Sequence, residues 1–119
     1  MKQEFLDYVD DVVDAIGNAL SFIEKMDYEN FLLDNKTIFA VTRALEIIGE
    51  AVKNIPQSVK SRYPQIPWKE IAGMRNKLIH EYFGVKQKVV WETVKKDLPL
   101  LKTHFDKIRE DYAGEIKPF

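Results

Sequence analysis

The chain has 119 residues, of which 45% are hydrophobic and 31% charged, and its formal net charge is −1. This length and balance fit one globular domain spanning residues 1–119 and exclude a disordered chain. The absence of cysteine excludes disulfides and thiolate chemistry. Because the N-terminus is acidic and apolar runs are short, we expect no signal peptide, no membrane contact and a cytoplasmic location.

Charge is distributed unevenly along the sequence. Residues 1–50 contain four basic and eleven acidic residues, whereas residues 51–88 contain eight basic and two acidic residues. The basic block is either one of two oppositely charged solvated faces or a local patch that attracts phosphate. Sequence alone leaves both interpretations open.

The first half of the chain predicts two long helices. Apolar residues at spacings of three and four predict a helix from about Lys2 to Met26, followed by a short turn or helix over Tyr28 to Leu33 and a break at Asp34 and Asn35. A second long helix is predicted from about Lys36 to Ile55. Its two apolar stripes predict burial on two sides, as in a central helix or one at a subunit interface.

A polar row on that second helix comprises Arg43, Glu46, Glu50 and Lys53. Residues three apart on a helix are neighbours, so Arg43 can pair with Glu46 and Glu50 with Lys53. The row is either an exposed edge with two weak ion pairs, which we favour, or a surface that orients cations at the basic centre.

The second half of the chain predicts further helices. A proline-containing link with one helical turn near Ser58 to Tyr63 precedes a helix from about Trp68 to Phe83, which Gly84 ends. A last helix is predicted from about Lys86 to Tyr112, with a kink or restart at Pro99 and Asp97 as a cap. Its predicted core face consists of Val89, Val90, Val94, Leu98, Leu101, Phe105 and Ile108. The fold class is therefore all-α, an antiparallel bundle of four main helices plus short helical pieces.

The predicted 68–83 helix carries the pattern Arg-x4-His-x-Tyr in its last two turns, formed by Arg75, His80 and Tyr82. Asn76 and His80 are four apart and share one helical face, whereas Arg75 and His80 differ by about 140° around the axis. Arginine presents a fork of donors that matches phosphate oxygens, and histidine transfers protons near neutral pH. Together they suit RNA cleavage by attack of its own 2′-hydroxyl, a reaction that needs no metal or other cofactor.

Each of these residues also has a purely structural interpretation. Arg75 could be a surface arginine, and His80 near a helix C-terminus gains from the dipole without any function. Tyr82 could be a partly buried tyrosine, while Trp68 and Phe83 suit core or interface packing better than base stacking. His104 lies among core-facing residues and is expected to be structural.

The run from Pro67 to Val85 resembles the signature of HepT-like proteins, which belong to the HEPN (higher eukaryotes and prokaryotes nucleotide-binding) superfamily. The segment from Arg43 to Ala51 is similar to that family's second-helix signature. Val90 to Val94 and Asp97 to Pro99 resemble its last helix. The likeness covers nearly the whole chain.

The resemblance implies a HEPN-like homodimer in which the motifs of two protomers meet in one cleft. It implies the toxin half of a type VII-like toxin–antitoxin module, acting as a metal-independent endoribonuclease on RNA. The partner would be an MntA-like minimal nucleotidyltransferase, an antitoxin that transfers AMP from ATP to the motif tyrosine. Carried over to this sequence, Arg75 and His80 are catalytic, Asn76 organises the site, and Tyr82 is the modification site.

Two other functions remain open from the residues alone. One is a non-catalytic helical module that docks on a nucleotidyltransferase and uses Arg75 and His80 to hold a nucleotide or phosphate. The other is a purely structural dimerisation protein. The same side chains bind phosphate in the first alternative and in the nuclease, so sequence separates the two poorly.

Overall fold

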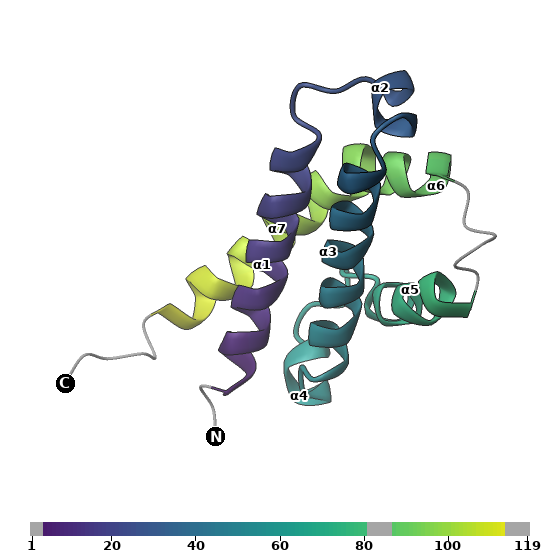
Figure 1. The fold of residues 1–119 in the computed structure, drawn as a ribbon. Helices are drawn as coiled ribbons and strands as arrows, with labels where there is room; N and C mark the ends of the chain where they lie inside the picture. The colour runs from purple at the N-terminus through teal and green to yellow at the C-terminus, as the bar shows by residue number, and fades with distance from the viewer. Residues whose placement is uncertain (1–3, 81–86, 114–119) are drawn as a thin grey trace.

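The computed structural model describes residues 4–80 and 87–113, and the side chains of those ranges except at positions 75–80. Every regular element in these ranges is helical (Figure 1). The elements in chain order are α1 (Glu4–Phe22), α2 (Tyr28–Leu32), α3 (Asn35–Lys53), α4 (Gln57–Lys60), α5 (Trp68–His80), α6 (Gln87–Glu92), the π-helical segment η1 (Thr93–Asp97) and α7 (Leu98–Tyr112). The described part of the chain thus confirms the predicted all-α class.

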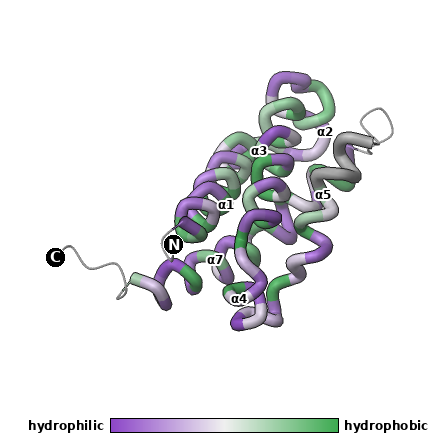
Figure 2. Tube along the Cα trace, turned by 90° about the horizontal axis from the view of Figure 1, so that it is seen from below, coloured by the Kyte–Doolittle hydropathy of each residue, from purple (hydrophilic) through white to green (hydrophobic). Residues whose placement is uncertain are grey.

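Helix α3 lies between α1 and α5 and packs extensively against both, and α1 also packs against α7. The two apolar stripes of α3 explain this position, because Val41, Leu45 and Ile48 are buried on one side and Ala44 and Ala51 on the other. The prediction of a helix buried on two sides is therefore confirmed. Hydrophobic and hydrophilic residues alternate along α1 and α3, as expected of helices with apolar faces (Figure 2).

Two aspartates set the starts of α2 and α3. Asp27 Oδ1 accepts a hydrogen bond from the Asn30 backbone N–H at 2.9 Å. Asp34 Oδ1 accepts from the Thr37 backbone N–H at 3.0 Å, and its Oδ2 accepts from the Thr37 hydroxyl at 2.8 Å. Both residues are N-caps, so the expected break at Asp34 is confirmed. The Thr37 hydrogen bonds lower the pKa of Asp34.

The C-terminal helix departs from the prediction in its middle. The predicted restart is present, since α7 begins at Leu98 with Pro99 in its first turn, but an unpredicted π-helical turn from Thr93 to Asp97 joins α6 to α7. Asp97 occupies the N-cap position of α7, as predicted, but it keeps helical dihedral angles and its side chain makes no capping hydrogen bond. Proline has no N–H and its ring crowds the carbonyl four residues earlier, and the wider turn directly before Pro99 accommodates both effects.

The predicted core face of this helix is correct apart from one residue. Val90, Val94, Leu98, Leu101, Phe105 and Ile108 are all buried. Val89, however, is 47% exposed, so its predicted core position is wrong. Adjacent residues on a helix point about 100° apart, and Val90 takes the inward position.

Candidate active site

The start of α5, the helix that carries the motif, is fixed by an aromatic anchor. The Trp68 indole N–H donates to the Tyr63 carbonyl oxygen at 3.0 Å. Its ring packs edge-on against Phe105 of α7, with centroids 5.6 Å apart. Trp68 is therefore a packing residue, as predicted, and it holds the first turn of α5 against α7.

Helix α5 leads from this anchor to the motif. Ile71 is buried, and α5 packs along α3. Arg75, Asn76 and His80 occupy the last two turns of α5, so the prediction that a helix carries them is confirmed. Their side chains lie outside the described part of the structure, as do Tyr82, Phe83 and the predicted stop at Gly84.

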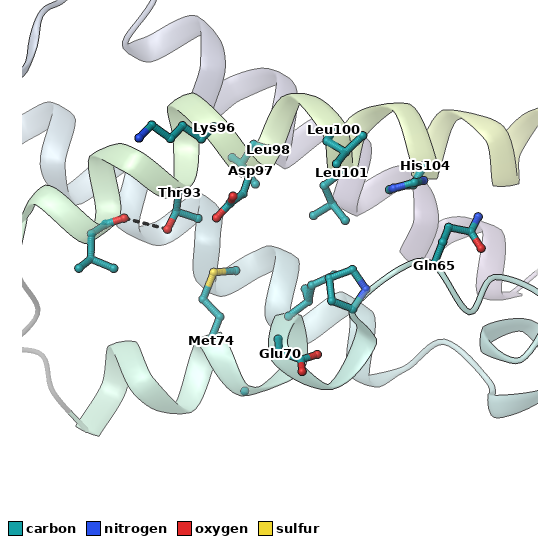
Figure 3. Close-up of a pocket in the computed structure, with 14 residues that line it drawn as sticks. Gln65, Glu70, Met74, Thr93, Lys96, Asp97, Leu98, Leu100, Leu101 and His104 are labelled. Carbon is teal, nitrogen blue, oxygen red and sulfur yellow. Dashed lines mark hydrogen bonds between the residues drawn. The ribbon is translucent and has the colours of Figure 1, made fainter.

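A hollow of about 640 Å³ opens beside the motif helix, between α5 on one side and η1 and α7 on the other (Figure 3). Met74, which directly precedes Arg75, extends from α5 toward Thr93 and Asp97 of η1. The wall is mostly apolar, with polar groups supplied by Gln65, Glu70, Thr93, Lys96, Asp97 and His104. The motif therefore begins at the edge of an open, largely apolar recess.

Two exposed apolar side chains border this recess. Val89 is 47% exposed and Leu100 is 62% exposed, and both line the hollow. Leu100 lies off the buried stripe of α7 that contains Leu98, Leu101 and Phe105. Large apolar side chains around an open recess are typical of a surface that another molecule covers.

One charged side chain that lines the recess, Lys96, forms an ion pair. Lys96 Nζ lies 2.6 Å from Glu92 Oε2, and this hydrogen bond lowers the pKa of Glu92 and raises that of Lys96. His104 was expected among core-facing residues, but it is only partly buried and lines the recess. It belongs to the same concave surface as Glu70 and Asp97.

On α3, the polar row is partly confirmed as an exposed edge. Arg43 Nη1 lies 3.8 Å from Glu46 Oε2, and the Arg43 side chain is 70% exposed. An exposed pair at this distance contributes little to stability. The alternative, in which the row orients the cations of the motif, stays a prediction because the motif side chains are not described.

The comparisons with known proteins agree on one family. The model of the family described as ribonuclease HepT-like matches residues 12–108. The chain belongs to the HepT-like ribonuclease family. The resemblance inferred from the motif is therefore confirmed.

Curated relatives of this HepT-like chain carry ribonuclease names. A protein named probable ribonuclease HepT from Thermococcus cleftensis is 54% identical over 110 residues, covering 92% of this chain and 100% of the relative. A candidate RNase of Methanocaldococcus jannaschii, MJ1216, is 44% identical over 114 residues, covering 96% and 94%. A candidate RNase of Caldanaerobacter subterraneus, TTE0752, is 42% identical over 101 residues, covering 85% and 90%. No solved structure matches this chain.

Two further properties concern the described residues of this HepT-like protein. Within residues 4–80 and 87–113, no group of three or more His, Asp or Glu side chains is placed to hold a metal ion. None of the described helices is long and apolar enough to cross a bilayer.

Sequence reasoning did not find the recess beside the motif. Its lining comes from α5, α6, η1 and α7 together with the segment before α5, and periodicity within one helix cannot bring these elements together. The available signal was Leu100, an apolar residue outside the helical stripe of its neighbours.

Proposed function

We propose that this HepT-like endoribonuclease is the toxin of a type VII-like toxin–antitoxin module and that it cleaves RNA without a metal ion. The observation that carries the proposal is the position of Arg75 and His80 in the last two turns of one helix, within a chain matched by the ribonuclease HepT-like family over residues 12–108. The proposal places the enzyme in the cytoplasm with its RNA substrate.

In the proposed reaction, the 2′-hydroxyl of RNA attacks the neighbouring phosphorus. His80 as a neutral imidazole accepts the hydroxyl proton, and the imidazolium of a second His80 protonates the departing 5′-oxygen. Arg75 stabilises the negative charge that grows on the non-bridging oxygens. The products are a 2′,3′-cyclic phosphate and a 5′-hydroxyl, and Asn76 is proposed to orient the two catalytic side chains.

A homodimer would supply the two histidines. The recess beside Met74, bordered by Val89 and Leu100, supports a second copy as the molecule that covers this face. An isologous contact would place both α5 helices next to each other, so that Arg75 and His80 of each protomer share one cleft. The proposed assembly is a dimer of antiparallel four-helix bundles with the HEPN-like arrangement, each formed by one domain over residues 1–119.

Regulation would act on the same cleft. We infer that an MntA-like nucleotidyltransferase antitoxin brings ATP to Tyr82. The phenolate oxygen would attack the α-phosphorus, diphosphate would leave, and the phenol proton would pass to solvent. The new phosphate would occupy the place of the scissile phosphate and neutralise the positive charge of Arg75.

The decisive experiment is cleavage of a labelled RNA by the purified chain in the presence of a chelator. We expect cleavage by the unaltered protein and a loss of about 10²–10⁴-fold in His80→Ala, the usual contribution of a general acid or base. His104→Ala is the matched control, because it removes the other histidine but no motif residue; light scattering should show that it keeps the mass of the unaltered protein, and it should then retain cleavage. If the unaltered protein cuts no RNA under any condition, the chain is instead a phosphate-binding module that docks on its partner.

A further inference from the structure

Among the described residues after the motif helix, lysines occupy two different environments. Lys96, Lys102 and Lys107 each lie 2.6–3.0 Å from a carboxylate oxygen four residues away along the chain. Lys88 Nζ instead lies 5.9 Å from the centre of the Tyr28 ring, and Lys95 Nζ lies 5.5 Å from the centre of the Trp91 ring. A hydrogen-bonded carboxylate offsets the lysine charge, whereas a ring contributes only about 0.5–1 kcal/mol at an exposed site. Lys88 also has a charge interaction with Glu92, whose carboxylate is already hydrogen-bonded to Lys96.

The rings beneath these two lysines have a rigid base. Trp91 packs against Phe31 with centroids 5.2 Å apart, and Phe31 is fully buried. Tyr28 lies 6.1 Å from the same indole, so α2 and α6 share one aromatic cluster. The ammonium groups of both lysines lie over rings of this cluster. A cation held near a ring loses less freedom when it binds an anion.

The position of this cluster relative to the motif is set by the recess. Met74 of α5 and Val89 of α6 line the same hollow, and Arg75 directly follows Met74. Lys88 lines a smaller hollow that shares Val89 and Thr93 with the recess, so it lies next to the recess wall. The C-terminal end of α5 and the start of α6 also lie at the same edge of the molecule (Figure 1).

We propose that Lys88 and Lys95 form a phosphate-binding ridge that holds the RNA strand beside the linkage cut at Arg75 and His80. The inference rests on the proposed function, and it adds the residues that grip the substrate away from the reacting bond. The two lysines lie two helical turns apart, and their ligands are phosphodiester groups of a single strand, contacted irrespective of base sequence. Separated cations beside aromatic rings are typical of single-stranded nucleic-acid sites.

Binding can be measured apart from cleavage with an RNA oligonucleotide whose riboses are 2′-O-methylated. This ligand retains every phosphate but lacks the attacking hydroxyl, so the protein can bind it without cutting it. Fluorescence anisotropy over a series of salt concentrations gives the slope of log K against log salt. Each phosphate contact to a single strand contributes about 0.7 to the magnitude of this slope, so Lys88→Gln/Lys95→Gln should reduce it by about 1.4.

The matched control is Lys102→Gln/Lys107→Gln, which changes net charge equally but removes lysines already paired with carboxylates. Its salt slope should equal that of the unaltered protein. If the two double variants have equal salt slopes, the proposed ridge is wrong. This holds whether both slopes equal that of the unaltered protein or both are reduced. The single variants, each expected to lower the slope by about 0.7, provide the same test if the double variant does not fold.

A parallel assay on unmodified RNA separates this inference from the proposed function. If the unaltered protein cleaves RNA and the salt slopes are equal, the ridge is wrong and the nuclease assignment stands. If the unaltered protein fails to cleave, the nuclease assignment is wrong, and the slopes still decide whether Lys88 and Lys95 bind phosphate.

Discussion

The Tyr63 hydroxyl donates a hydrogen bond to Asp111 Oδ2 at 2.8 Å, and this bond joins the segment before the motif helix to the end of α7. Next to it, the Arg62 guanidinium donates to the Tyr112 hydroxyl. The Tyr63 carbonyl also accepts the Trp68 indole N–H. Tyr63, which precedes Asp111 by 48 residues in the chain, thus links α7 to the first residue of α5.

We expect Tyr63→Phe to lower the free energy of unfolding by about 1 kcal/mol, the usual net contribution of one hydrogen bond. The substitution keeps the buried ring, so the loss is limited to the hydroxyl. Urea denaturation followed by circular dichroism measures the change. Tyr8→Phe, a partly buried tyrosine on α1, is the control, and an equal loss in both variants would contradict a specific role for the Tyr63 bond.

The same bond predicts a pH dependence of stability. The hydrogen bond from Tyr63, and then the one from Lys107, lowers the pKa of Asp111. Because this carboxyl has a lower pKa in the folded than in the unfolded protein, its ionised form stabilises the fold. The stabilisation is fully present above the unfolded pKa of about 3.9 and is lost as the pH falls through the folded pKa. We therefore expect the stability difference between the unaltered protein and Tyr63→Phe to be constant from pH 7 to about pH 5 and to shrink below about pH 4. Denaturation series across this range test it, and a difference that grows on acidification would show the opposite sign.

Much of the helical framework could be predicted from sequence because its signals are local. Asp34 caps α3 and the double stripe of α3 is buried on two sides, both of which follow from residue type and spacing. Val89 was placed in the core incorrectly, because two adjacent valines compete for one inward position and spacing alone cannot choose between them. The π-helical turn before Pro99 was also missed, since a proline signals a disturbed helix without fixing how the backbone adapts.

The candidate site could be predicted only in part, for a different physical reason. The order of Arg75, Asn76 and His80 along one helix follows from sequence, and α5 contains all three. Whether a guanidinium and an imidazole converge depends on a second chain in the proposed dimer, which periodicity within one chain does not encode. The recess around Met74 depends on how α5 and α7 pack, and this is a property of the tertiary fold.

The proposed dimer face yields a direct prediction for Leu100. Replacing this 62% exposed side chain with Glu should convert a dimer into a monomer, because each isologous interface would then contain two buried, unpaired carboxylates. Light scattering coupled to size-exclusion chromatography measures the mass, and RNA cleavage should fall together with dimerisation. Leu33→Glu is the control, since Leu33 follows α2, outside the recess, and is 85% exposed. A monomer from Leu33→Glu but not from Leu100→Glu would place the interface on another face.

The proposed modification predicts that Tyr82 is needed for neutralisation and not for cleavage. After co-expression with a nucleotidyltransferase of the expected kind, a peptide containing Tyr82 should gain the mass of an adenylate group, and the protein should lose RNA cleavage because the added phosphate occupies the cleft beside Arg75. Tyr82→Phe should remain unmodified and active under the same conditions. Tyr28→Phe serves as the control, since it keeps Tyr82 and should still be silenced. Equal cleavage by the modified and unmodified proteins would refute inhibition by phosphate occupancy, because an adenylated Tyr82 would then leave the scissile phosphate free to reach His80.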